Sequence, residues 1–164
     1  MALATEVLLW LHIVAAAGLV GAAMVFGMII GPSLPALTPV ARGEFLVKVL
    51  PKYVRYAQIL TVITPLIGVA LAFSLPGGTA SAFNPSTRFG MFISAGAGLS
   101  LVTLVVAFGV IGPASKKVVK LTEETMKNQG PSSPDLMAAN NKVRIGAAVG
   151  LFILLAILVC MVAA

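Results

Sequence analysis

Four long stretches of the sequence contain no Asp, Glu, Lys or Arg, and each is apolar enough to cross a lipid bilayer. They are Val7–Ala41, Tyr56–Thr87, Phe89–Ser115 and Ile145–Ala164. A helix needs about 20 apolar residues to span the hydrocarbon core of a bilayer, and each stretch supplies them. We therefore predict an all-α fold, a four-helix transmembrane bundle with spans at about 4–30, 53–75, 88–111 and 142–164.

The connections between these stretches contain Gly-Pro pairs and clusters of basic residues. Proline has no N–H and clashes with the preceding turn, so Gly31-Pro32 and Gly112-Pro113 predict the ends of the first and third spans. The basic segments that follow, 40–50 and 114–128, combine apolar and charged positions and favour amphipathic helices at the membrane interface. The segment Pro76–Thr87 is rich in Gly, Ser, Pro and Asn and predicts an irregular loop.

Basic residues lie almost entirely on one side of the predicted membrane. Ten of the eleven Lys and Arg residues follow the first or the third span, and only Arg88 lies in the connection between the second and third. Short loops rich in Lys and Arg stay in the cytoplasm, so we expect both termini outside a prokaryotic cell membrane. The same charges attract anionic lipid headgroups, so the net charge of +6 does not indicate a nucleic-acid partner.

The two halves of the sequence resemble each other. Phe26–Pro32 reads FGMIIGP and Phe108–Pro113 reads FGVIGP, and a basic segment follows each. The next spans begin with similar tetrapeptides, KYVR at Lys52–Arg55 and NKVR at Asn141–Arg144. The pattern predicts a duplicated hairpin. Both copies cross from outside to inside and back, so their pseudo-two-fold axis runs along the membrane normal.

Composition excludes a soluble domain and favours no enzyme class. Hydrophobic residues make up 59% of the chain and charged residues 10%, too few to cover a soluble domain of 164 residues. The sequence shows no nucleophile motif, carboxylate pair, phosphate loop or zinc spacing, so we lean towards a protein without enzymatic activity. Apart from residues at the membrane interface, no Asp, Glu, Lys or Arg lies inside a span, which argues against an ion-coupled transporter.

Small residues within the spans indicate close helix packing. Gly27 and Gly31, like Gly146 and Gly150, are spaced four residues apart and allow helix backbones to approach closely. Such pairs are typical of contacts within a bundle or between subunits. The leading functional hypothesis is therefore a non-catalytic accessory subunit that packs in a larger membrane complex or in a homo-oligomer within the lipid bilayer.

His12 is the only histidine and lies inside the first span. Ionisable groups within a membrane are costly and often functional, and imidazole is a common metal ligand. Met91, Cys160 and Met161 lie near the outer ends of the third and fourth spans, and soft sulfur ligands select Cu(I). A copper site of His12 with these three residues is one interpretation. The other is that His12 bonds a neighbouring carbonyl and the methionines fill gaps in the packing.

Haem is the second cofactor that His12 could bind, as an axial ligand. Since the chain has one histidine, a haem b would need Met as its other axial ligand, or a histidine from another chain. The segment Leu11–Gly21, followed by a Gly-Pro pair and a basic segment, resembles the four-helix membrane proteins related to the copper-resistance protein D (CopD) family. Leu19-Val20-Gly21 stands where that family often has Trp-x-Gly. The resemblance implies copper handling or haem association.

Overall fold

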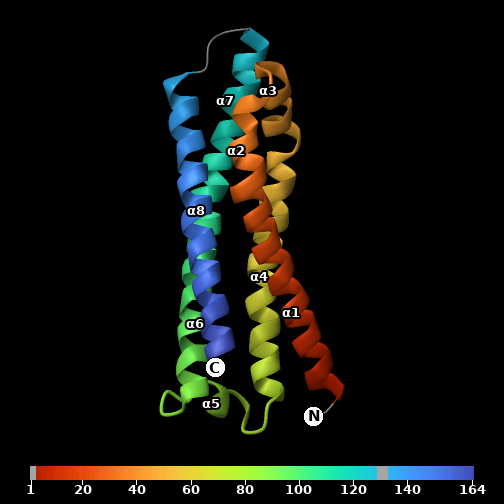
Figure 1. The fold of residues 1–164 in the computed structure, drawn as a ribbon, viewed down its shortest axis with the longest axis vertical. Helices are drawn as coiled ribbons and strands as arrows, with labels where there is room; N and C mark the ends of the chain where they lie inside the picture. Colours follow the sequence, from red (N-terminus) through yellow and green to blue (C-terminus); the bar gives the residue numbers. More distant parts are fainter. Residues whose placement is uncertain (1–2, 129–132) are drawn as a thin grey trace.

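A computed structural model describes residues 3–128 and 133–164 and consists of long antiparallel helices (Figure 1). Four continuous helical rods cover Leu3–Ala36, Pro39–Ser74, Arg88–Asn128 and Pro134–Ala163, and all four are long and apolar enough to cross a membrane. The predicted all-α four-helix bundle is therefore confirmed, and the chain is a small multi-pass membrane protein. In detail the elements are α1 (Leu3–Met24), η1 (Val25–Ile30), α2 (Gly31–Ser33), η2 (Leu34–Ala36), α3 (Pro39–Lys48), α4 (Leu50–Ser74), α5 (Gly78–Ala82), α6 (Arg88–Val105), η3 (Val106–Ile111), α7 (Gly112–Asn128) and α8 (Pro134–Ala163).

The rods form a ring in which each packs against its two neighbours in sequence order. Helix α1 packs most extensively on α4, and α6 on α8, so each hairpin is one tight pair. Contacts of α4 with α6 and α7, and of α1 with α8, close the ring. Helices α1 and α6 are therefore diagonal to each other, and the two chain ends lie at the same end of the bundle (Figure 1).

The Gly-Pro pairs do not end the first and third helices, and this corrects the prediction from sequence. In both places the turn before the proline widens into a π-helix, where Gly31 N–H bonds to Phe26 O and Gly112 N–H to Ala107 O, each five residues back. The wider turn accepts one extra residue, so the helix continues past the proline instead of clashing with it. The first rod runs on to Ala36 and the third to Asn128.

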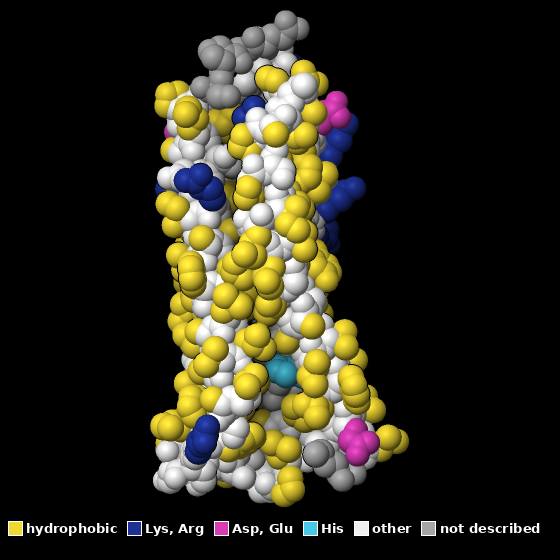
Figure 2. All heavy atoms as spheres, in the orientation of Figure 1, with side chains coloured by type: hydrophobic (Ala, Val, Ile, Leu, Met, Phe, Trp, Pro, Cys, Tyr) yellow, Lys and Arg dark blue, Asp and Glu magenta, His cyan; other side chains and the backbone are white. Residues whose placement is uncertain are grey.

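The basic segment 114–128 continues the third helix as α7, whereas the basic segment 40–50 forms α3 and the start of α4, at the beginning of the second rod. A rod of 41 residues, such as Arg88–Asn128, is about 60 Å long, twice the roughly 30 Å of a bilayer core. The bundle must therefore project well beyond the membrane at one end. Figure 2 shows that most Lys and Arg side chains gather in the half of the bundle away from the termini.

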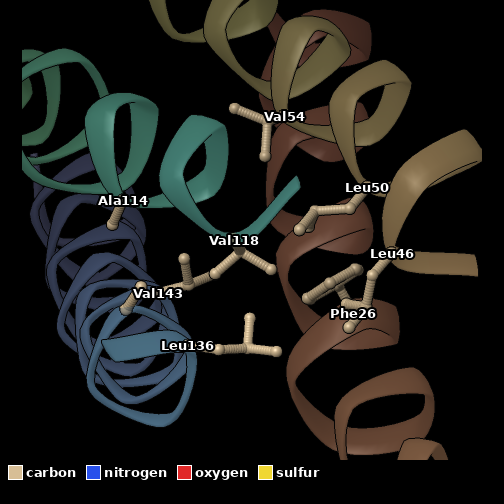
Figure 3. Packing of buried hydrophobic residues seen from close by; sticks show 9 residues of the cluster. Phe26, Leu46, Leu50, Val54, Ala114, Val118, Leu136 and Val143 are labelled. Atoms are coloured by element: carbon tan, nitrogen blue, oxygen red, sulfur yellow. The ribbon is translucent and has the colours of Figure 1, made fainter. Parts of the chain in front are cut away.

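The main hydrophobic core lies in this projecting half, between α3, α4, α7, α8 and η1 (Figure 3). Leu50 and Val118 are its most completely buried side chains. At the top of the bundle α3 and α7 pack so closely that a Cβ on Gly43 would lie 2.7 Å from the sulfur of Met126. Hydrophobic burial stabilises contacts in water but not between helices in lipid, which explains why the core forms where the helices leave the bilayer.

The connection between α4 and α6 is more ordered than the predicted irregular loop. It contains the short helix α5, which follows a turn in which Gly77 and Gly78 have positive φ angles of 81° and 59°. These left-handed conformations favour glycine because a Cβ would clash with the backbone. The Thr87 side chain then caps α6 by accepting a hydrogen bond from Gly90 N–H. The segment rich in Gly and Pro therefore forms a tight turn and a short helix instead of an irregular loop.

The two hairpins share the same irregularity at the same place. Each has a six-residue π-helix directly before its Gly-Pro pair. Val54 and Val143, which occupy matching positions in the KYVR and NKVR tetrapeptides, are both buried. These parallels support the duplication. The position of its axis stays a prediction.

Candidate functional site at His12

The imidazole of His12 lies against α4, and its Nδ1 is 3.0 Å from the carbonyl oxygen of Thr64. A carbonyl oxygen can only accept a hydrogen bond, so Nδ1 must carry the proton in this arrangement. The neutral ring then presents the lone pair of Nε2, and no hydrogen bond to Nε2 occurs in the described part of the chain. In Figure 2 the histidine is visible at the surface, surrounded by apolar side chains.

Gly68 makes room for the imidazole one turn along α4 from Thr64. A Cβ at this position would lie 2.9 Å from Cε1 of His12, well inside van der Waals contact. The site therefore depends on a glycine on the face of α4 that α1 covers. Sequence analysis identified His12 but missed Thr64 and Gly68, because their role depends on how α4 is rotated against α1.

Thr64 also brings an unsatisfied polar group to this site. Its side-chain hydroxyl is buried and has no hydrogen-bond partner among the described residues. Buried hydroxyl groups are normally hydrogen-bonded, and an exception calls for a physical explanation such as a water or a ligand. The site thus combines a fixed imidazole with a free ring nitrogen and, on the neighbouring helix, an unpartnered hydroxyl.

The three sulfur residues predicted to join His12 lie on the other hairpin. Met91 is on α6, the helix diagonal to α1, and its exposed fraction is 52%. Cys160 and Met161 are on α8, which does contact α1. Cys160 packs towards α6, since a Cβ on Gly96 of α6 would lie 3.7 Å from the Cβ of Cys160. The contacts of His12 are with α4, and those of Cys160 are with α6.

The glycines predicted to pack helices occupy three different environments. Gly27 faces Leu151 of α8, and a Cβ on Gly146 would lie 2.9 Å from Ile111, so these two glycines serve contacts inside the bundle. A Cβ on Gly31 would lie 3.1 Å from Phe26 O, the carbonyl that accepts the Gly31 N–H in the π-helix. Gly150 has open space at its Cβ position. Of these four glycines, Gly27 and Gly146 therefore pack against other helices of the chain, and Gly150 does not.

Among residues 3–128 and 133–164 no three His, Cys, Asp or Glu side chains group together in a way that could hold a metal ion. Comparison with family models, curated proteins and solved structures found no match to this chain. The function must therefore be argued from the surface of the bundle and from the geometry at His12.

Proposed function

We propose that this protein is a non-catalytic helical subunit that packs against further membrane helices, either of other subunits or of a second copy. The observation that carries this proposal is how little the spans bury among themselves. In an apolar 18-residue stretch of each of the four spanning helices, only 11% to 17% of the residues are buried inside the bundle. Most of the apolar surface is thus available to lipid or to other helices.

Two exposed glycines support helix contacts on this outer surface. Gly21 of α1 and Gly98 of α6 are exposed, and a Cβ at either would meet nothing within 4 Å. They serve no packing within the chain. In lipid there is no hydrophobic drive between helices, and close backbone approach at small residues is a main source of association. Such positions favour a neighbouring helix over lipid.

The test is native electrophoresis and crosslinking after mild extraction from the native membrane. We expect the wild-type chain to migrate in a larger assembly. A Gly21→Leu, Gly98→Leu double variant should shift towards the single chain, because the bulky side chains prevent close approach but meet nothing inside the bundle. Val159→Leu is the matched control, since Val159 is 65% exposed on α8, which carries neither glycine. A single-chain species for the wild type under every mild condition would contradict the proposal.

A second candidate function is copper or haem binding through His12. The observation that favours it is the hydrogen bond from Nδ1 to Thr64 O. Metal-bound histidines almost always donate their other ring N–H to a carbonyl or carboxylate, which fixes the ring and leaves the second nitrogen for the metal. Met91, Cys160 and Met161 are the sulfur donors proposed for copper, and a methionine or a partner residue would complete haem ligation.

Protein purified from its native membrane tests this candidate. Copper is measured by elemental analysis and haem by its Soret absorption. We expect His12→Ala to remove the metal or pigment while the helical circular dichroism is retained. Thr64→Val is the control, because it keeps the carbonyl that orients His12 and removes only the hydroxyl. Wild-type protein that contains neither copper nor haem would leave His12 as a packing residue.

A further inference from the structure

A surface cavity of about 340 Å³ lies in the projecting half of the bundle, far from His12, and basic and amide side chains line it. Arg42 of α3 contributes from one side, and Met137, Asn140, Asn141 and Arg144 of α8 from the other. The lining thus contains two arginines and two asparagines, and no acidic residue among the part of the chain that the structure describes. We call this cavity the arginine pocket.

Arg42 lines the arginine pocket and carries a donor that no described residue satisfies. Its Nε atom is buried and has no hydrogen-bond partner among the described residues. Leaving a buried donor unpaired is energetically costly, and more so for a charged group. An unsatisfied group of this kind in a folded protein calls for a bound water or ion.

Three carboxylates on α3, α7 and α8 pair with lysines, and Glu123 on α7 is exposed. In the described part of the chain Glu44 pairs with Lys48, Asp135 with Lys117 and Glu124 with Lys120. None of these ion pairs includes Arg42 or Arg144. Arg42 and Arg144, on different helices, thus line one cavity with no acidic residue among its described lining, and a bound anion would supply the counter-charge.

We propose that the arginine pocket binds a phosphate-bearing anion. The planar guanidinium fork matches phosphate oxygens in a bidentate manner, and charge-assisted hydrogen bonds of this kind are roughly twice as strong as neutral ones. The amide groups of Asn140 and Asn141 supply further donors. The volume lies at the lower end of the range of about 300–1,000 Å³ for small-molecule sites, which suits a headgroup or a small phosphate compound.

The phosphate can come from a phospholipid or from a soluble compound, and the position of the pocket is compatible with both. Arg144 is the last charged residue before the uncharged stretch Ile145–Ala164, which is about 30 Å long as a helix and so fills the bilayer core. Arg144 therefore lies at the level of the headgroups. Met137 and Asn140 lie nearer the N-terminus of α8, further from the bilayer core, and both are exposed.

Two binding arms distinguish these sources. In the first, the delipidated full-length chain in a nonionic detergent is titrated with inorganic pyrophosphate, and binding is followed by calorimetry and by the rise in the unfolding midpoint that binding to the folded state produces. In the second, native mass spectrometry counts the lipids retained from vesicles of phosphatidylcholine and phosphatidylglycerol. Binding in the first arm identifies a soluble phosphate compound as a ligand, and retention in the second alone identifies a headgroup.

Matched variants connect either result to the arginine pocket. We expect the Arg42→Gln, Arg144→Gln double variant to lose at least tenfold in affinity. Arg42→Lys should lose several-fold, because it keeps the charge but not the bidentate fork. Lys116→Gln, Lys127→Gln removes two charges from exposed positions on α7 and should bind as the wild type does. Absence of binding in both arms, or equal losses in the two double variants, would overturn the proposal.

Discussion

The side chain of Gln58 on α4 donates a hydrogen bond of 3.1 Å from its Nε2 to the carbonyl oxygen of Ala107, inside the π-helix η3. The same carbonyl accepts the N–H of Gly112, five residues on. Gln58 therefore joins the two hairpins at the point where the third helix is irregular. Carbonyl oxygens have two lone pairs, so both hydrogen bonds can form at once.

We expect Gly112→Ala to destabilise the bundle, because the new Cβ would lie 2.9 Å from Gln58 Nε2 and displace the amide from Ala107 O. The loss should be about 0.6–1.7 kcal/mol, the range for hydrogen bonds between membrane helices. Reversible unfolding in mixed detergent micelles measures it. Gly150→Ala is the matched control, since its Cβ meets nothing within 4 Å. Equal stability of Gly112→Ala and wild type would contradict the role of Gln58.

The sequence was sufficient to predict the four helices but not how they continue past Gly31 and Gly112. Hydropathy depends on local composition, and runs of apolar residues this long have few alternatives to a membrane helix. Whether a Gly-Pro pair ends a helix or induces a π-turn depends on what surrounds it. At Gly112 the surroundings include Gln58, which is 54 positions earlier in the sequence and could not be assigned to Ala107 O without the fold.

At the candidate site, too, some residues could be predicted from the sequence and others could not. His12 was identifiable because an imidazole inside an apolar span is unusual. Thr64 and Gly68 lie in the part of α4 beyond Thr61, which is almost entirely apolar, so no residue there marks the face that α1 covers. Likewise, the sequence assigned Arg42 and Arg144 to topology and to lipid headgroups, because only the folded arrangement shows that they line one cavity.

The contact between His12 and Gly68 predicts a specific non-additivity. Gly68→Ala should destabilise the wild-type chain, since the Cβ would overlap Cε1 of His12. In a His12→Ala background the same change should cost much less, because the space is then empty. A double-mutant cycle measured by unfolding should give a coupling within the 0.5–3 kcal/mol that is usual for residues in contact. Additive effects would show that the imidazole does not occupy this position.

The hydrophobic core in the projecting half should dominate stability. Leu50 is only 1% exposed, so Leu50→Ala should cost about 2–5 kcal/mol from lost transfer free energy and the remaining cavity. Leu101→Ala is the control, because Leu101 is 65% exposed on the apolar surface. Its effect should stay near 0.5 kcal/mol or below, as for other surface positions. If the two variants unfolded alike, the core would not be the stabilising element.

The duplication predicts a symmetric experimental structure. Residues 8–75 should superpose on residues 89–162 by a rotation close to two-fold about the membrane normal, with η1 falling on η3. The equivalent π-helices before Gly31-Pro32 and Gly112-Pro113 motivate this expectation. Cryo-electron microscopy of the chain in its native assembly provides the coordinates for the superposition. An axis in the plane of the membrane would refute a parallel repeat.

The membrane orientation follows from where the charges lie on the long helices. Arg88 is the only basic residue at the end that carries the termini and α5, whereas the opposite end holds the other ten. Because Lys and Arg are retained in the cytoplasm, we predict that α5 faces outside and the tip of α7 faces inside. A cysteine introduced at Ser81 in a Cys160→Ser background should react with a membrane-impermeant maleimide in intact cells. A cysteine at Lys127 should react only after the cells are opened. Labelling of the Ser81 position from the cytoplasmic side alone would reverse the orientation and place the arginine pocket outside.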